Sequence, residues 1–535
     1  MRQRQRIDRR GAGRGSLFAL AAGVLAVSML VPLIFAMIEG DERIARAFLY
    51  AALFTGFSAA IMGVALASGR ARRGPESEIV TLLALWLILP CFAAIPLVLL
   101  TPSLGWVGAW FEMVASLTTT GSTGYLEPTR VPEAIHLWRA VVSWLGGLLT
   151  LTAAYVILAP RRMGGFEVRT PTASAAGVDT GDVRLAELGA ETPPVDERIH
   201  RAMRTILPVY IAMTVALVML LGAAQQLSLS TIVHALGIVS TSGVSTGAPQ
   251  TPHFENIPAE IIAAVFLVLA ATARLYGKAA TIGRDVPVRR DPELRLMALI
   301  VIVATLTLFL RHWTAALELE DGESAIDALS ALWGIFFTTL SFLTTTGYEA
   351  AAWDSASAWA GLKNPTLLLL GLAAIGGGAA TTAGGIKLIR AAALIRHGLR
   401  EIDRLAQPNV VGGSGTGVGA GLRGLVGEGA FLGWAFIMLY AGAVLTVTLG
   451  LATSGLSFEP AFIAAVSAVS NTGPVFGAVA GGHESYALLD GAQRAWIAVG
   501  MVVGRMETLA VIALFRRDAL LSLLPRRKTT GNTVD

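Results

Sequence analysis

Four short turns rich in serine, threonine and glycine are the residues of this chain whose types and spacing could do chemistry. They are Leu117-Thr-Thr-Thr-Gly121, Val239-Ser-Thr-Ser-Gly243, Leu343-Thr-Thr-Thr-Gly347 and Val469-Ser-Asn-Thr-Gly473. Small side chains let backbones approach closely, and glycine permits conformations that direct successive carbonyl oxygens to one side. A ring of such oxygens can replace the hydration shell of a cation. The fourfold repetition therefore predicts an ion pore. The alternative is that the four turns are outer loops that only cap helices.

The segments around these turns are those of a membrane protein. Of 535 residues, 54% are hydrophobic and only 15% are charged, whereas charged residues make up about a quarter of a soluble domain. About 20 apolar residues span a bilayer. About ten candidate spans lie at 17–38, 47–68, 78–100, 134–159, 204–223, 258–276, 294–310, 365–396, 428–452 and 492–515.

Shorter apolar runs precede each turn, at 106–117, 229–239, 328–343 and 460–469. They are too short to span and suit re-entrant helices. A unit of span, re-entrant helix, turn and span thus occurs four times, and two crossings per unit place every turn on the same side. The predicted fold is an all-α membrane protein in which four parallel helix–pore-loop–helix repeats form a pseudo-tetrameric pore, beside two leading helices.

The predicted boundaries follow these units. They are 1–76 for a basic N-terminus and the two leading helices, 77–160 for repeat 1, 161–202 for a cytoplasmic loop, 203–277 for repeat 2, 293–398 for repeat 3 with a broken helix, 399–426 for a cytoplasmic hairpin, 427–516 for repeat 4 and 517–535 for a cytoplasmic tail.

The distribution of basic residues predicts the orientation. With the N-terminus in the cytoplasm, 32 of the 41 Lys and Arg residues fall in inner segments and seven in outer ones. Such asymmetry sets topology, and it accounts for the basic composition without a nucleic-acid partner. We expect a multi-pass protein of the bacterial inner membrane, in contact with lipid, with both termini in the cytoplasm.

The span at 365–396 contains a glycine-rich interruption, Ile375-Gly-Gly-Gly-Ala-Ala-Thr-Thr-Ala-Gly-Gly-Ile-Lys387. Each glycine costs about 1 kcal/mol relative to alanine inside a helix, so we expect a broken helix here. Close packing of small residues is the alternative, although packing alone would not need the pair Thr381-Thr382. Lys387, at the inner end of the run, is more typical of a positive-inside residue than of a pore element.

Arg505 lies well inside the last apolar span, where a charge costs at least about 2.5–3.5 kcal/mol. We interpret it as a positive charge below the turns that deters cation flow. A structural ion pair with Glu507 or with Glu112 is the alternative.

Several motifs together make the chain resemble the TrkH/KtrB-type potassium transporters, in the TrkH branch. They are the four turns, Trp138-Arg139-Ala140, Trp144-Leu-Gly-Gly147, the run from Ile375 to Lys387, Gln407-Pro-Asn409 and Gly504-Arg505-Met-Glu507. The resemblance runs from about residue 77 to 517, and the two leading helices also fit it.

The resemblance implies a homodimer with one pore per protomer, a cytosolic nucleotide-binding regulatory subunit of the RCK type, and potassium bound by backbone oxygens just before each glycine. The implied filter residues are Thr119, Thr120, Gly121, Thr241, Ser242, Gly243, Thr345, Thr346, Gly347, Asn471, Thr472 and Gly473. It also places the interruption beneath the filter as a gate. The implied gate residues are Gly376, Gly377, Gly378, Thr381, Thr382, Gly384, Gly385, Lys387 and Arg505.

The expected function is potassium uptake driven by the membrane potential, which is worth about 2.3 kcal/mol per charge per 100 mV. A K⁺/H⁺ or K⁺/Na⁺ symporter and a less selective Na⁺/K⁺ channel are the alternatives. We do not expect an enzyme, because Gly243-Val-Ser-Thr-Gly247 has the hydrolase spacing but neither a preceding strand nor placed Asp and His partners.

Overall fold

A computed structural model gives the fold of the chain. It describes residues 14–67, 76–125, 127–159, 195–247, 254–276, 291–316, 325–359, 366–406, 428–479 and 485–506. Residues 161–194 of the predicted cytoplasmic loop 161–202, the tail 517–535, most of the hairpin 399–426 and Glu507 lie outside these residues, whereas 195–202 form the start of a helix. Within the described ranges every regular element is helical, which confirms the all-α prediction.

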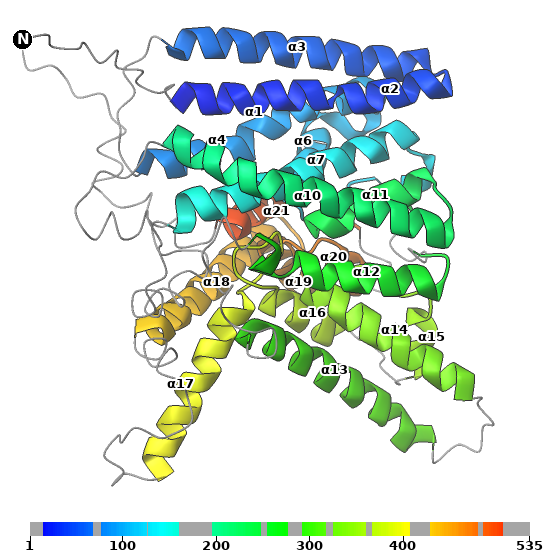
Figure 1. The fold of residues 1–535 in the computed structure, drawn as a ribbon, viewed down its shortest axis with the longest axis vertical. Coiled ribbons are helices and arrows are strands. Elements are labelled where there is room, and N and C mark those ends of the chain that lie inside the picture. Colours follow the sequence, from blue (N-terminus) through cyan, green and yellow to red (C-terminus); the bar gives the residue numbers. More distant parts are fainter. Residues whose placement is uncertain are drawn as a thin grey trace, which may run out of the picture.

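Two leading membrane passages stand outside the repeats. The first is formed by α1 (Arg14–Ser28) and α2 (Leu30–Glu39), the second by α3 (Glu42–Ala67), and a left-handed glycine at Gly40 turns the chain between them. Figure 1 shows these helices side by side at one edge of the molecule. Their outward faces are apolar, as lipid contact requires.

The first two repeats have the predicted order of elements. Repeat 1 consists of α4 (Glu76–Ala93), α5 (Ile95–Leu100), η1 (Pro102–Leu104), α6 (Gly105–Leu117), η2 (Pro128–Arg130), α7 (Glu133–Ala153) and the π-helical η3 (Ala154–Leu158). Repeat 2 consists of α10 (Val195–Gln225), α11 (Leu229–Ser240), α12 (Ile257–Ala270) and η5 (Ala273–Tyr276). Side chains cap two of these helices, since Ser228 accepts from Thr231 N and Asn256 from Ala259 N, which satisfies amides that have no partner inside the helix.

Repeats 3 and 4 follow the same plan with additions. Repeat 3 has α13 (Pro292–Ala316), α14 (Ala325–Leu343), α15 (Trp353–Trp359), α16 (Thr366–Ile375) and α17 (Leu388–Ala406). Repeat 4 has α18 (Glu428–Thr453), α19 (Phe458–Val469), α20 (Pro474–Val479), η9 (Tyr486–Leu488) and α21 (Gly491–Met506). Neighbouring repeats touch through α7 and α11, α12 and α14, α16 and α19, and α21 and α6. The four units therefore close into a ring.

Among the described residues, seven helical stretches are long and apolar enough to cross a membrane, and they correspond to seven of the ten candidate spans. The remaining three candidates are the second passages of repeats 2, 3 and 4. Helix α12 has only 14 residues, α21 is described only as far as Met506, and the predicted span 365–396 is divided into α16 and α17. The chain is nevertheless a multi-pass membrane protein by length and composition.

Candidate functional site

The four turns end their helices in the same way. Each has one residue with a left-handed backbone, and the next residue returns its amide hydrogen to a carbonyl five residues back. The left-handed residues are Thr119 (φ 52°), Thr241 (φ 51°), Thr345 (φ 61°) and Asn471 (φ 53°). The returning bonds are Thr120 N to Ala115 O at 2.8 Å, Ser242 N to Gly237 O at 2.8 Å, Thr346 N to Ser341 O at 3.0 Å and Thr472 N to Ser467 O at 2.9 Å. This is a Schellman-type helix end, here built on residues that rarely adopt positive φ.

The glycines that follow pack the turns against one another in a closed cycle. A Cβ atom on Gly121 would lie 1.8 Å from Ser242 O, and one on Gly243 would lie 2.0 Å from Thr346 O. In the same way Gly347 meets the ring of Pro474, and Gly473 meets Thr120 O at 2.6 Å. Turn 1 therefore abuts turn 2, turn 2 abuts turn 3, turn 3 abuts turn 4, and turn 4 returns to turn 1. Only glycine fits these positions.

The fourth turn departs from the other three. Gly121, Gly243 and Gly347 have positive φ, but Gly473 does not. The amide of Gly473 instead donates to Thr120 O at 2.6 Å, and Ser467 Oγ donates to Thr472 O at 2.8 Å. Two of the eight backbone oxygens expected to bind potassium thus accept hydrogen bonds from the protein in this structure. Pro474 begins α20 here, which explains why the chain cannot continue as it does in the other turns.

Buried side chains that the sequence reasoning did not assign hold the turns from outside. Glu112 pairs with Arg139 (Oε1 to Nε, 2.5 Å) and accepts the amide of Gly124 at 2.7 Å. Arg139 also donates to Ser245 O at 3.3 Å, which connects turn 1 to turn 2. The suggested pairing of Arg505 with Glu112 is therefore wrong, because Glu112 is already neutralised by Arg139. Charges inside apolar segments were the available signal, since such charges are rarely without a role.

Turns 2 and 3 are joined by a tyrosine. Tyr348, directly after Gly347, donates its hydroxyl to Val244 O at 2.7 Å. Its ring lies against His234 and Phe254 at centroid distances of 5.4 and 5.8 Å. His234 is thus part of the aromatic packing behind the turns.

The glycine-rich segment 376–387 forms a closed loop between α16 and α17. Ile386 N donates to Ala374 O and Lys387 N to Ile375 O, both at 2.9 Å, so the two ends of the loop meet. Positive φ at Gly376 (73°) and Gly385 (75°) allows that close approach. Gly377, Gly378 and Gly384 are buried in the loop, and Thr381 Oγ1 donates to Gly378 O at 2.7 Å. The long helix is therefore broken, as its sequence predicts.

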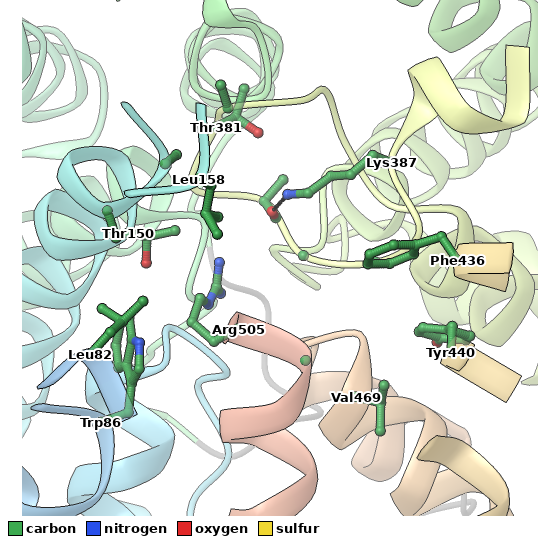
Figure 2. Close-up of a pocket in the computed structure, with 17 residues that line it drawn as sticks. Leu82, Trp86, Thr150, Leu158, Thr381, Lys387, Phe436, Tyr440, Val469 and Arg505 are labelled. Atoms are coloured by element: carbon green, nitrogen blue, oxygen red, sulfur yellow. Dashed lines mark hydrogen bonds between the residues drawn. The ribbon is translucent and has the colours of Figure 1, made fainter. Parts of the chain in front are cut away.

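Lys387 lies inside the protein. It is 8% exposed, and its ammonium group donates to Ala383 O within the loop. The closed loop therefore turns the Lys387 side chain into the protein, and the interpretation of Lys387 as a positive-inside residue stays a prediction. Figure 2 shows the lysine reaching toward the same space as Arg505.

The loop sits directly against the inner ends of the turns. Thr382 Oγ1 accepts from Thr241 Oγ1 at 3.1 Å, and Gly384 N donates to Thr345 Oγ1 at 2.8 Å. A Cβ atom on Gly384 would lie 2.0 Å from Ser470 O. Turns 2, 3 and 4 are thus all in contact with the loop.

Arg505 completes this contact from α21. Its Nε donates to Thr118 O at 2.8 Å, its Nη2 donates to Thr119 Oγ1, and its Nη1 donates to Thr382 O at 2.6 Å. Arg505 therefore bonds turn 1 to the loop. Among the residues that the structure describes, its partners are oxygens of the turns and the loop and no carboxylate is paired with it. The guanidinium of Arg505 consequently lies under the turns.

Three more contacts hold the loop, and the sequence reasoning missed all of them. Glu293 Oε1 accepts from Ala379 N at 3.0 Å, and Ala271 O accepts from Gly378 N at 3.1 Å. Tyr155 donates its hydroxyl to Ala380 O at 3.4 Å. The loop therefore contacts residues of every repeat.

Comparisons with known proteins agree with this geometry. The family model described as TrkH, cation transport protein, matches residues 43–522. The chain is 28% identical over 436 residues to the Trk system potassium uptake protein TrkH of Salmonella typhimurium, covering 80% of this chain and 83% of that protein. It is 26% identical over 505 residues to the Trk system potassium uptake protein TrkI of Halomonas elongata, covering 92% and 93%. The crystal structure of the potassium transporter TrkH from Vibrio parahaemolyticus superposes with a TM-score of 0.74 at 23% identity, covering 95% of this chain and 99% of that one.

Proposed function

Because the chain belongs to the TrkH family of cation transport proteins, we propose that it takes up potassium ions through the ring of four turns. The closed cycle of glycine contacts carries this proposal: each turn is pressed against the next, so their backbones surround one axis. Relatives over most of the chain are named potassium uptake proteins, which agrees with potassium as the transported ion. The membrane potential supplies the driving force, about 2.3 kcal/mol per charge per 100 mV.

Backbone oxygens of the turns are the proposed potassium ligands. The helices α6, α11, α14 and α19 each end at a turn, and the negative ends of their dipoles favour a cation at that point. The residues that supply oxygens are Thr119, Thr120, Thr241, Ser242, Thr345, Thr346, Asn471 and Thr472, with the glycines Gly121, Gly243, Gly347 and Gly473 as spacers. Thr120 O and Thr472 O accept hydrogen bonds from Gly473 and Ser467, so these two bonds must be exchanged when an ion binds. Turns 1 and 4 therefore adapt to the ion more than turns 2 and 3.

We propose that the loop 376–387 and Arg505 form the gate. The loop lies under three turns and Arg505 bonds it to the fourth. A buried guanidinium repels a cation far more strongly in this low-dielectric setting than it would in water. Opening requires the loop to give up its bonds to Thr241, Thr345 and Arg505. The loop contains no helix, so opening unfolds no secondary structure. It breaks only the contacts between the loop and its neighbours.

The proposed setting is the bacterial inner membrane, with both termini in the cytoplasm, a second copy of the chain as partner, and a cytosolic nucleotide-binding subunit as regulator. The charge asymmetry supports the orientation. Glu293 lies in the first turn of α13, just after a segment that this orientation places in the cytoplasm, and it bonds the gate loop. A regulator that moves the start of α13 would therefore act on the gate through one side chain.

Cation flux into proteoliposomes that hold the purified chain tests this function. We expect potassium flux driven by a clamped potential, with a reversal potential near that of potassium. Flux only with a proton or sodium gradient would favour a symporter, and equal currents of Na⁺ and K⁺ would favour a less selective channel. Measuring Arg505→Ala in parallel guards against a closed gate, since this variant should conduct without a cytosolic partner. If neither protein carries potassium while both remain folded, the proposal is wrong.

A further inference from the structure

A cavity of about 40 Å³ lies beside the gate, between repeats 1, 3 and 4. Figure 2 shows Leu82 and Trp86 on one side of it, Phe436 and Tyr440 on the other, and Arg505 and Lys387 between them. A buried water needs roughly 10–15 Å³ by this measure, so the cavity has room for about three particles of that size. None of the residues that we propose as potassium ligands lines this space, although Val469 at the start of turn 4 does.

The polar groups that line this cavity are mostly hydrogen-bond donors. Arg505 and Lys387 both line it and are only 7% and 8% exposed. No aspartate or glutamate is among its lining residues within the described part of the chain. Glu293, the acid that bonds the gate loop, does so at Ala379, which does not line the cavity. Two cationic side chains thus line one buried space, and no carboxylate of the described residues lines it with them.

The indole of Trp86 is the second, independent sign of a ligand. Trp86 is 1% exposed, and its Nε1 is a buried donor with no hydrogen-bond partner among the described residues. An unpaired buried donor costs about 1–3 kcal/mol, so native structures rarely keep one without a reason. Trp138, equally buried in the same repeat, has its Nε1 satisfied by Ala93 O at 2.9 Å. The lack of a partner is therefore specific to the tryptophan of the cavity.

The donors of Arg505 lead to the same conclusion. A guanidinium carries five N–H donors, and three bonds to Thr118, Thr119 and Thr382 use three of them. All three acceptors are uncharged oxygens. A buried cation normally has a counter-charge, because an unpaired one is costly in a low-dielectric interior. The cavity that Arg505 lines together with Lys387 and Trp86 has room for such a counter-charge.

We propose that this cavity binds a small inorganic anion of halide size, held by Arg505, Lys387 and the Trp86 N–H. Its volume limits the ligand to a monatomic ion with one or two waters. Leu82 and Phe436, which line it, are only 3% and 4% exposed, and the small volume does not fit a lipid headgroup. A bound anion offsets the charge of Arg505 and lowers the barrier to a cation beneath the turns. Anion occupancy and gate position are thereby coupled.

Bromide tests the site directly, because it can be located by anomalous scattering in crystals of the full-length protein. We expect a bromide peak in the cavity, close to Arg505, Lys387 and Trp86 Nε1. Crystals that show bromide elsewhere and none in the cavity would overturn the proposal. A peak that refines as the phosphate of a lipid would overturn it as well.

Thermal unfolding in detergent gives a second measurement that does not depend on transport. At constant K⁺ concentration and ionic strength, replacing gluconate by bromide should raise the unfolding temperature, because an anion that binds only the folded state stabilises it. In Trp86→Phe, which keeps the ring and removes the donor, this shift should fall to half or less. In the matched control Trp434→Phe, on the exposed face of α18, the shift should remain. Equal shifts in both variants would refute the role of Trp86, whether or not the chain conducts potassium.

Discussion

The ring of turns and the loop beneath it are both built from glycine and threonine, but they are stabilised in opposite ways. Each turn is closed by a bond to its own helix, as in Thr120 N to Ala115 O. The loop 376–387 has internal bonds at its base and in its body, but its position is set by side chains from elsewhere: Arg505 of repeat 4, Thr241 of repeat 2 and Tyr155 of repeat 1. A turn can therefore form wherever its helix forms, whereas the loop has its position only once the whole ring has assembled.

This difference shows how the same residue types, glycine and threonine, can form both a rigid ring and a loop that depends on its neighbours. Local bonds fix the geometry of each turn, and the glycine contacts between turns leave no room for a larger side chain. The loop depends on a few long-range bonds, each of which is worth about 0.5–3 kcal/mol and can be broken singly. We expect changes in the ring to alter which ion passes, and changes around the loop to alter how often it passes.

Gly121→Ala should have the largest effect, and it acts on the ring. A Cβ atom at this position would lie 1.8 Å from Ser242 O, on a backbone with φ of +74°. We expect the K⁺/Na⁺ permeability ratio to fall about 100-fold, which corresponds to about 2.8 kcal/mol. Reversal potentials under mixed-ion gradients measure it. The control is Gly442→Ala in α18, where nothing lies within 4 Å of the added atom. Equal permeability ratios in the two variants would show that the ring does not determine selectivity.

Arg505→Ala should release the loop. The change removes three hydrogen bonds and the positive charge below the turns. We expect basal potassium flux without a partner protein to rise about tenfold or more, the factor that about 1.4 kcal/mol gives, with the permeability ratio unchanged. Arg505→Lys keeps the positive charge but cannot make the same set of hydrogen bonds. It therefore separates the repulsion of the cation from the hydrogen bonds that hold the loop. Unchanged flux in a folded Arg505→Ala protein would show that the arginine is no barrier.

Glu293→Gln should loosen the loop by a smaller amount. The neutral amide can still accept from Ala379 N, but a hydrogen bond to a charged group is worth about 1 kcal/mol more than one to a neutral group. Basal flux should therefore rise about fivefold. Glu42→Gln is the control, because that side chain is 85% exposed at the start of α3. A fall in flux at Glu293→Gln would mean that this contact holds the gate open.

Tyr348→Phe should have the smallest effect and should appear on selectivity alone. It removes the hydroxyl bond to Val244 O, which joins turns 2 and 3, and costs about 1 kcal/mol. The permeability ratio should fall about twofold to fivefold, while basal flux stays the same. The lipid-facing Tyr50, which is 61% exposed, provides the control Tyr50→Phe. A rise in basal flux instead would contradict the assignment of selectivity to the ring and of flux control to the loop.

Much of this architecture was predictable because its signals are local. Repetition of the turns, the short helices before them and the break at 376–387 all follow from propensity and hydropathy along the chain, and the structure contains each of them. Arg505 was recognisable as a special position because a charge inside an apolar span is costly. Hydropathy did not locate where the helices end inside the predicted spans 258–276 and 365–396, because α12 stops at Ala270 and a loop separates α16 from α17.

What only the tertiary structure decided is which groups meet. The order of the turns around the ring, the pairing of Glu112 with Arg139 rather than Arg505, and the inward position of Lys387 depend on contacts between residues far apart in sequence. Thr119 and Asn471 occupy equivalent places in the sequence, yet Thr119 bonds Arg505 while Asn471 bonds Met501 O and Thr120. The sequence determined four equivalent turns because each is closed by its own helix. Their inequivalence arose from packing, because four different neighbours surround them.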